Sequence, residues 1–341
     1  NVAIATVADV MDLTEENRIL VKQGLEMLKR TSNLGLRALI QCIGLEGKKI
    51  QAYHIGFILA PCLNASGKLD TAKRALALLR AKTEREADML AGDLKALNES
   101  RRDMTDRVVD EAMAKVERTD IRGDKVLVIY LPDCHESLAG LVAGRVRENY
   151  YRPVFVLTDS EDGVKGSGRS IESYSMYEEL TGCGDLLTKF GGHPMAAGLS
   201  LDKENVEKFK RRLNDQCTLS EEELTEKVVI DMELPFAAIT EHFIEELEYM
   251  EPFGKGNTKP VFAARGVAMQ HVKIIGKNKN VAKATAIDAA GNRMEAICFH
   301  DAQEFAKQCE RNNGKMSITF YPGINEFRGE RQIQIVITHY R

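Results

Sequence analysis

The stretch Lys-Val-Leu-Val-Ile-Tyr-Leu at residues 125–131 has the composition of a strand buried on both faces. A second run of this kind, Val-Phe-Val-Leu-Thr, occupies residues 154–158. The residues between them, about 136–149, follow a helical pattern. Two buried strands joined by a helix predict a βαβ unit, and therefore an α/β domain with a partly parallel sheet. We expect this domain to cover residues 119–218.

Immediately upstream, residues 83–118 contain no proline and a single glycine. Their apolar side chains recur at steps of three, four and seven, which places them on one face of a helix. The remaining positions carry charges of both signs. We therefore expect one long, largely solvated helix that connects two domains.

Residues 1–82 are expected to be the C-terminal remainder of another α/β domain. The small apolar residues 2–8 predict a buried strand that ends at Asp9, and helices are expected from Thr14, over about 34–43 and over 70–80. Residues 61–69 are small and polar and predict a loop. Because the chain opens inside the first predicted strand, we expect more of the same domain to precede residue 1.

Residues 225–341 change character. A series of short strand-like runs is interrupted by a single helix near 301–310, which is the pattern of a small barrel of the OB type. The predicted strands are residues 228–232, 261–275, 281–288, 293–299, 316–321 and 332–338.

The composition of the 341-residue chain is that of a globular protein, with 44% hydrophobic and 29% charged residues. The 47 Lys and Arg against 51 Asp and Glu give a net charge of −4, which excludes a globally basic nucleic-acid binder but not a local basic patch. No apolar run is long enough for a transmembrane helix. The seven cysteines form no CxxC pair, which favours a reducing, cytoplasmic location.

Asp9 is the first candidate for chemistry. A carboxylate at the carboxyl end of a buried α/β strand lies where such folds bind ligands, and it is a suitable ligand for a hard metal ion. The alternative is a helix N-cap or a solvated loop aspartate.

The motif Gly166-Ser167-Gly168-Arg169-Ser170 is the second candidate. Its glycines could let the backbone approach an anion, its hydroxyls can donate hydrogen bonds, and its arginine suits a phosphate. The alternative is a glycine hairpin with an exposed arginine.

Two further motifs contain histidine. In residues 191–198, Gly191 and Gly192 present His193 on a backbone that only glycine permits, which favours phosphate binding or acid–base chemistry over a structural role. In residues 135–145, His135 precedes a helix whose N-terminus is an anion site, although a capping or core role for His135 is equally open.

A basic stretch lies in the predicted barrel. Residues 255–287 contain seven Lys and Arg and no acidic residue, which predicts a track for a nucleic-acid backbone rather than a balanced sheet face. The residues assigned to this track are Lys255, Lys259, Lys273, Lys277, Lys279, Lys283 and, from the last hairpin, Arg328.

Taken together, these motifs resemble the RecJ single-strand-specific DNA exonucleases of the DHH phosphoesterase superfamily, in order and over essentially the whole chain. Residues 5–10 are similar to a metal-binding motif of the DHH domain, 61–69 to its substrate loop and 83–118 to the connecting helix. Residues 135–145, 166–170 and 191–198 are similar to the DHH-associated domain, and 251–257 and 327–334 to the OB domain.

The resemblance implies a 5′-to-3′ exonuclease that uses two Mn²⁺ or Mg²⁺ ions to release mononucleotides from single-stranded DNA in repair and recombination. It makes Asp9 a metal ligand and places His193 at the phosphate near the metals. Ser167 and Arg169 would hold the 5′-terminal phosphate. The implied substrate-binding set is completed by Asn64, Lys68, His135, Arg145, Gly168, Ser170, Gly191 and Gly192.

The chain also departs from the family pattern. Cys62 and Lys68 stand where the family usually has arginine, and lysine lacks the bidentate fork. Neither His-x-Asp-x-Asp nor Asp-His-His occurs in the sequence. We therefore expect the remaining metal ligands upstream of residue 1, and we expect this chain alone to be inactive.

Two other functions stay open: a nuclease-inactive adaptor that binds single strands, and another DHH phosphodiesterase that acts on short oligonucleotides. The expected partner is single-stranded DNA, with a single-strand-binding protein or a helicase as candidate protein partners. We expect no membrane association and a monomer.

Overall fold

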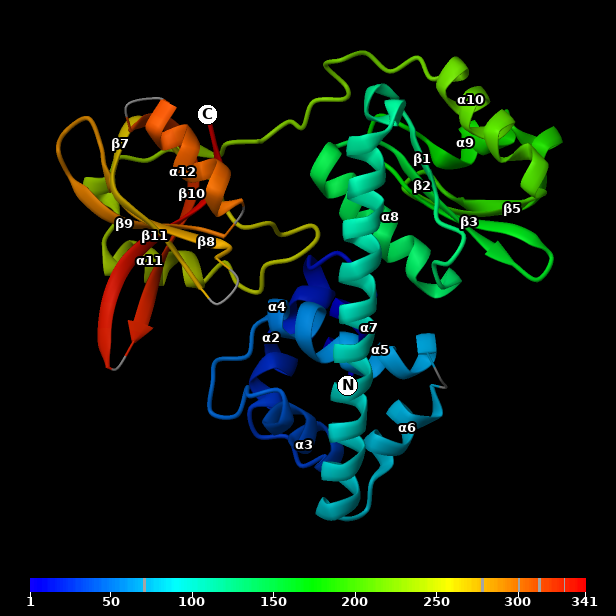
Figure 1. The fold of residues 1–341 in the computed structure, drawn as a ribbon. Coiled ribbons are helices and arrows are strands. Elements are labelled where there is room, and N and C mark those ends of the chain that lie inside the picture. The colour runs from blue at the N-terminus through cyan, green and yellow to red at the C-terminus, as the bar shows by residue number, and fades with distance from the viewer. Residues whose placement is uncertain (70–71, 277–278, 300, 312–313, 328) are drawn as a thin grey trace. The chain divides into compact units, whose positions relative to one another are not determined.

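The computed structural model describes residues 1–341 except 70–71, 277–278, 300, 312–313 and 328, and except the side chains of 66–69 and 327. The chain divides into two compact units. One unit holds residues 1–30, 47–58 and 228–341, and the other holds residues 31–46 and 59–227. Figure 1 shows the elements of both.

The α/β domain is built on the predicted βαβ unit. Strand β1 (Leu127–Tyr130) pairs in parallel with β2 (Val154–Ser160), and helix α8 (Glu136–Tyr150) connects them. Strands β3 (Gly163–Arg169), β5 (Ala196–Leu201) and β4 (Leu187–His193) continue the sheet in antiparallel fashion, in the order β1-β2-β3-β5-β4. The predicted α/β domain with a partly parallel sheet is thereby confirmed.

Each face of this sheet has its own core. Helix α8 packs on the face that carries Val154 and Val156, and all its buried apolar residues belong to that core. Helices α9 (Met176–Thr181) and α10 (Val206–Gln216) pack on the other face, around Phe155 and Phe209. Because side chains alternate along the strands, the sheet contributes residues to two separate cores. Short 3₁₀ turns lie at Asp120–Gly123, Gly184–Leu186 and Lys203–Asn205.

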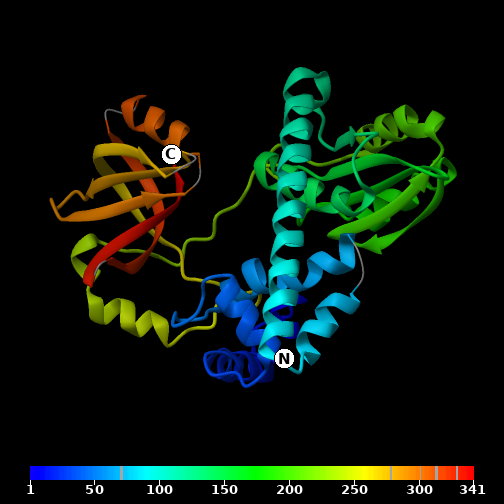
Figure 2. The same ribbon diagram turned by 60° about the horizontal axis from the view of Figure 1, so that its bottom comes forward.

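The predicted connecting helix is confirmed as α7 (Glu84–Arg118). It begins at Thr83, whose hydroxyl accepts a hydrogen bond from the Glu86 N–H at 3.2 Å. Its first half packs against α3 (Leu34–Cys42), α5 (Ala60–Leu69) and α6 (Lys73–Arg80), as Figure 2 shows, and its last turns pack against α8. The helix therefore joins a helical region to the sheet domain.

Two N-terminal predictions are wrong. Residues 2–8 form helix α1 (Val2–Ala8) instead of a strand, and residues 61–69 lie in helix α5 instead of a loop. A short apolar run fits either a strand or a buried helix turn, and Pro61 is tolerated because it lies in the first turn of α5. The described part of residues 1–82 contains no strand.

The remaining N-terminal elements are also helical. Helix α2 (Glu15–Leu28) confirms the helix predicted from Thr14, and α3 confirms the one predicted over 34–43. Helix α4 (Ala52–His54) continues through a π-helical turn (Ile55–Leu59) into α5. Helix α1 packs on α2, where Gly24 leaves room for Ala3.

The turn between α1 and α2 is joined to the segment that precedes the barrel. The Leu13 N–H donates to the Lys255 carbonyl at 2.7 Å, and Leu13 is buried against Gly254. The Arg18 guanidinium donates to the carbonyl of Met250 at 2.9 Å, at the end of helix α11 (Glu241–Glu248). These contacts explain why residues 1–30 belong to the same unit as the barrel.

The C-terminal domain is a closed OB barrel, as predicted. Its strands are β7 (Phe262–Ile275), β8 (Val281–Ile287), β9 (Arg293–Cys298), β10 (Lys315–Phe327) and β11 (Glu330–Tyr340). They follow the order β10-β11-β9-β8-β7, and β10 also pairs with β7, which closes the barrel. Helix α12 (Ala302–Arg311) is the predicted helix. The strand predicted over 228–232 is only β6 (Met232–Glu233), and α11 and a 3₁₀ turn (Phe236–Ala238) were not predicted.

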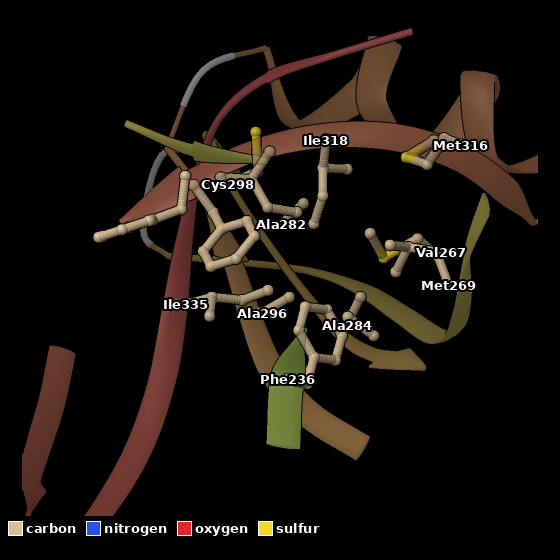
Figure 3. Packing of buried hydrophobic residues seen from close by; sticks show 14 of the residues in the cluster. Phe236, Val267, Met269, Ala282, Ala284, Ala296, Cys298, Met316, Ile318 and Ile335 are labelled. Atoms are coloured by element: carbon tan, nitrogen blue, oxygen red, sulfur yellow. The ribbon is translucent and has the colours of Figure 1, made fainter. Parts of the chain in front are cut away.

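The barrel interior is narrow. Figure 3 shows Ala282, Ala284 and Ala296 pointing inward with Phe236 and Ile335. Small residues on β8 and β9 leave space for the larger side chains of the facing strands. Among the described residues, no helix has both the length and the apolar character needed to cross a lipid bilayer.

Two helical glycines provide a matched stability test. A Cβ on Gly35 of α3 would lie 1.9 Å from the Leu78 carbonyl oxygen, whereas a Cβ on Gly92 of α7 would meet open space. We expect Gly35→Ala to lower the free energy of unfolding by about 1–3 kcal/mol through overpacking. Gly92→Ala should raise it by about 0.5–1 kcal/mol because alanine favours the helix. Urea unfolding measures both, and equal effects would contradict the described packing.

Asp288 provides a pH test in the barrel. Its carboxylate accepts hydrogen bonds from the N–H groups of Phe236 (3.1 Å), Ala290 (3.0 Å) and Asn292 (2.9 Å). Burial alone would raise the pKa of Asp288. Hydrogen bonds from the Asn292 side chain and from these backbone groups lower the pKa by more, so that it lies below its ordinary value of 3.8.

We expect Asp288→Ala to destabilise the domain by about 1–3 kcal/mol at pH 7, because three backbone donors lose their acceptor. Since the folded-state pKa is lowered, this stabilisation is present above the unfolded value of 3.8 and is lost as the pH falls through the folded pKa. The difference in unfolding free energy between the two proteins should therefore stay constant at higher pH and shrink as the pH falls below 3.8. Unfolding curves of both proteins between about pH 7 and pH 3 measure this change. A difference that stays constant over this range would refute the assignment.

Candidate functional site

A pocket of about 510 Å³ opens on the α/β domain, on the sheet face that also carries α8. Strands β3, β5 and β4 form its floor, and the first turn of α8 forms one wall. Its lining is rich in cations, hydroxyls and glycine: Glu136, Ser137, Ala139, Thr158, Lys165, Gly166, Ser167, Lys189, Phe190, Gly191, Gly198, Leu199 and Ser200. Such a lining suits an anionic ligand.

Glycines leave the pocket floor bare. Gly191 of β4 pairs with Gly198 of β5, and Gly198 pairs with Ser167 of β3, so the three positions lie side by side on one face. A Cβ on Gly191 would meet open space, which indicates room for a ligand above the backbone. Gly192 has a φ of +153°, and a Cβ there would lie 2.4 Å from the Ala196 carbonyl oxygen. The predicted glycine requirement beside His193 is therefore confirmed at Gly192.

His193 ends strand β4 and is exposed. It pairs with Ala196 and lies two residues after Gly191, so both positions face the same side of the sheet. The side chain is therefore available to a ligand at the end of the bare floor. Its predicted role stays a prediction.

The N-terminus of α8 borders the pocket. His135 is the N-cap residue, and its Nδ1 accepts a hydrogen bond from the Ser137 N–H at 3.3 Å and lies 2.7 Å from the Ser137 hydroxyl. The capping alternative for His135 thus has direct support. The positive end of the α8 helix dipole nevertheless lies at the pocket.

A salt bridge lies at the pocket edge. The Lys165 ammonium contacts the Glu136 carboxylate at 2.8 Å, and both side chains are exposed. The hydrogen bond between them lowers the pKa of Glu136 and raises the pKa of Lys165. An incoming anion could take the place of Glu136 on Lys165, because an exposed ion pair contributes little stability.

Residues 166–169 of the motif lie in strand β3, and Ser170 follows directly after the strand. A Cβ on Gly168 would lie 2.3 Å from the Met176 sulfur and 2.7 Å from the Phe155 ring, so Gly168 faces the core opposite the pocket. The expectation that Gly168 lets the backbone approach an anion is therefore wrong. Ser170 is buried and donates to the Tyr174 carbonyl at 2.5 Å, which gives it a structural role.

Ser167 and Arg169 face the other side. Ser167 lines the pocket, and Arg169 lies half-buried beneath α8, where Gly140 leaves room for its guanidinium. Arg169 Nη1 donates to the Gly168 carbonyl at 2.8 Å. Burial, followed by the nearby charge of Arg147, lowers the pKa of Arg169. An anion beside this guanidinium would therefore be stabilising.

Asp9 belongs to the other compact unit, as the exposed C-cap residue of α1, where its N–H donates to the Ala5 carbonyl at 2.9 Å. The predicted position at the end of a strand is wrong, although the carboxylate remains accessible. In the part of the chain that the structure describes, no three His, Cys, Asp or Glu side chains lie close enough to hold a metal ion. These residues alone therefore do not fit a two-metal centre.

Two other predicted substrate residues lie outside the pocket lining. Asn64 is exposed on α5. Arg145 is exposed on α8, nine residues after Glu136, which corresponds to about 14 Å along the helix axis. The structure therefore does not bring Asn64 and Arg145 together with Ser167. The side chain of Lys68, also predicted to bind substrate, falls outside the described residues.

The predicted basic track is partly neutralised. Lys255 pairs with Asp12 at 3.0 Å and Lys283 with Glu295 at 2.7 Å. Lys259 lies over the Tyr321 ring at 4.8 Å from its centroid. Lys273 and Lys279 are exposed, and Lys277 and Arg328 lie outside the described residues. The balancing acids come from other segments, so the one-sided charge of the sequence overstates the charge of the surface.

Several pocket residues were not singled out from the sequence. Lys165 alternates with Ser167 and Arg169 on β3, and Lys189 alternates with Gly191 and His193 on β4. This two-residue period was the available signal, since alternate residues of a strand share a face.

The comparisons with known proteins agree with this architecture. A family model described as the DHHA1 domain matches residues 123–219, and one described as the RecJ OB domain matches residues 230–339. The single-stranded-DNA-specific exonuclease RecJ of Bacillus subtilis (strain 168) is 34% identical over 339 residues, which are 98% of this chain and 43% of that protein. RecJ of Escherichia coli (strain K12) is 32% identical over 98% of this chain and 59% of its own length.

A solved structure agrees as well. RecJ from Thermus thermophilus, in complex with Mn²⁺, superposes with a TM-score of 0.83 at 27% identity and covers 99% of this chain and 48% of its own. The chain thus spans about 40–60% of the length of such relatives. It belongs to the RecJ exonuclease family and carries the DHHA1 and OB domains of that family.

Proposed function

We propose that this chain is the strand-binding and 5′-end-binding part of a RecJ-type 5′-to-3′ exonuclease for single-stranded DNA that acts in repair and recombination. The observation that carries the proposal is the pocket on the α/β domain. Lys165, Lys189 and the N-terminus of α8 supply positive charge around the bare glycine floor, and Ser167 supplies a hydroxyl.

A terminal phosphate suits this pocket better than an internal one. A phosphate monoester carries nearly two negative charges at pH 7 and three free oxygens, whereas an internal phosphodiester carries one charge. Lys165 and Lys189 line the pocket, and the half-buried Arg169 lies on the same face of β3 as Ser167. The two lysines, with Arg169 on the same face, therefore favour the 5′-terminal phosphate of a DNA strand over an internal phosphate.

The proposal includes a metal centre to which Asp9 contributes. The relatives include RecJ structures solved with Mg²⁺ and with Mn²⁺, and we infer that Asp9 supplies one ligand to such an ion. Among the described residues, Asp9 does not belong to a group of three or more possible ligands, so the residues of this chain alone supply no hydrolytic step. The role of His193 at the reacting phosphate, and the domain boundaries after 82, 118 and 218, likewise stay predictions.

The OB domain would hold the DNA strand, and Lys273 and Lys279 are among the exposed cations of the predicted track that the structure describes. Single-stranded DNA is therefore the proposed partner, and a single-strand-binding protein or a helicase remains a candidate protein partner. The second candidate function is a nuclease-inactive adaptor that binds single strands through the same surfaces.

The 5′-phosphate pocket can be tested by binding alone. We expect the chain to bind a 5′-phosphorylated single strand about 10- to 100-fold more tightly than the 5′-hydroxyl strand, because charge-assisted hydrogen bonds are worth about 1.5–3 kcal/mol. Arg169→Ala should remove most of this difference. Fluorescence anisotropy at fixed salt measures it.

The matched control for that test is Arg212→Ala. Arg212 is a partly exposed cation on α10, on the opposite side of the sheet, where it pairs with Asp185 at 2.7 Å. The Arg212→Ala substitution should change the affinities for the 5′-phosphorylated and the 5′-hydroxyl DNA strand by the same factor. If wild-type protein did not distinguish the two strand ends, the assignment of the pocket would be wrong.

Catalysis distinguishes the exonuclease from the adaptor. We expect residues 1–341 alone to release no nucleotides with Mn²⁺, because the described residues lack a metal cluster. A longer protein that adds the remaining metal ligands should release mononucleotides and should lose this activity on Asp9→Ala. Release by residues 1–341 alone would contradict the first expectation. An inactive longer protein that still binds strands would favour the adaptor.

A further inference from the structure

The outer face of the barrel carries a polar row that the phosphate track does not explain. Figure 3 shows Ala284 and Ala296 directed into the barrel interior. Because side chains alternate along a strand, their neighbours Thr285 and Glu295 point outward. This surface lies on strands β8 and β9.

The strand register aligns the row across the sheet. Thr285 of β8 pairs with Glu295 of β9, and Glu295 pairs with Gln334 of β11. Gln334 in turn pairs with Gly323 of β10. Directly paired residues share a face, so these side chains form one line that ends at the bare backbone of Gly323.

Two acceptors in this row have no partner. Glu295 Oε2 contacts the Lys283 ammonium at 2.7 Å, but Glu295 Oε1 is buried and accepts no hydrogen bond. Gln334 Oε1 is buried and unpartnered as well. The Glu295 side chain is only 12% exposed. An unsatisfied buried acceptor is destabilising, so a donor that reaches either oxygen would be bound favourably.

Open space and apolar side chains adjoin the row. A Cβ on Gly323 would meet nothing within 4 Å. The adjacent row contains Ile297 and Val336, which pair with each other and present half-buried apolar side chains. An apolar strip beside two acceptors is suited to a nucleobase, whose face is apolar and whose edge is polar.

We propose that Glu295 and Gln334 recognise the amino group of a nucleobase and so make the OB domain favour cytosine and adenine over thymine. This inference rests on the proposed binding of single-stranded DNA. The exocyclic amino group of cytosine or adenine carries two N–H donors for the two acceptors, and carboxylates pair with cytosine N4 in other complexes. Thymine presents carbonyl oxygens on either side of its one N–H, and these would repel both acceptors.

The same arrangement determines which side of the bound DNA strand faces the barrel. A carboxylate in the middle of the row repels phosphate, so the bases would face Glu295 and the backbone would follow the cations at the margin. Lys273, which pairs across the strands with Lys283, is such a cation. The row thus adds base selectivity to a surface that otherwise attracts any single strand.

The experiment compares oligo(dC) and oligo(dT) of equal length and with the same 5′ end, using the full 341-residue chain and fluorescence anisotropy at fixed salt. We expect oligo(dC) to bind about 5- to 10-fold more tightly, as for one matched amino group. Glu295→Ala should bring this ratio close to one without weakening oligo(dT), because it also frees Lys283 to meet phosphate.

Gln334→Leu is the second variant, and it should reduce the ratio while it leaves the Lys283–Glu295 pair intact. Lys279→Ala is the matched control, because loss of an exposed cation should weaken both oligonucleotides alike. Thermal melting establishes that each variant is folded. Equal binding of both oligonucleotides by wild-type protein, or an unchanged ratio in folded Glu295→Ala, would overturn the inference and leave strand binding intact. Binding of neither oligonucleotide would overturn the proposed function itself.

Discussion

The two-sided character of strand β3 is the constraint on which the α/β domain depends. Gly166 and Gly168 face one core, where Leu157 and the Phe155 ring occupy the space that a side chain would need. The alternate positions, Ser167 and Arg169, face α8 and the pocket. A shift of one residue in register would bury the arginine in the apolar core and expose the glycines. Core packing and the anion pocket are therefore fixed by the same pairing.

Periodicity predicted the fold wherever it extended over a long segment. The βαβ unit, the helix α7 and the closed barrel all follow from apolar spacing that tertiary contacts do not override. It failed at α1, because seven small apolar residues fit a strand and a helix equally well. It also failed at α5, where small and polar residues with Pro61 indicate a loop although proline is tolerated in a first helical turn.

The candidate site was less predictable, since it depends on residues distant in sequence. Gly192 could be identified because its backbone conformation excludes a side chain, whatever surrounds it. The lysines of the basic stretch could not be assessed, because their partners Asp12 and Glu295 lie in other segments. The motif at 166–170 was singled out from the sequence, but the roles of its glycines required knowledge of which face is buried.

The closure of the barrel has a consequence for how the domain forms. Strand β7 pairs with β10, and β9 pairs in parallel with β11, so these two pairings form only after β10 and β11 have been synthesised. Pairings between such distant segments make folding slow, and until they form, β7 and β9 present open edges. A chain interrupted before β10 would therefore hold unpaired strands that can add to other chains. The C-terminal hairpin thus protects the nascent domain from self-association as well as completing its core.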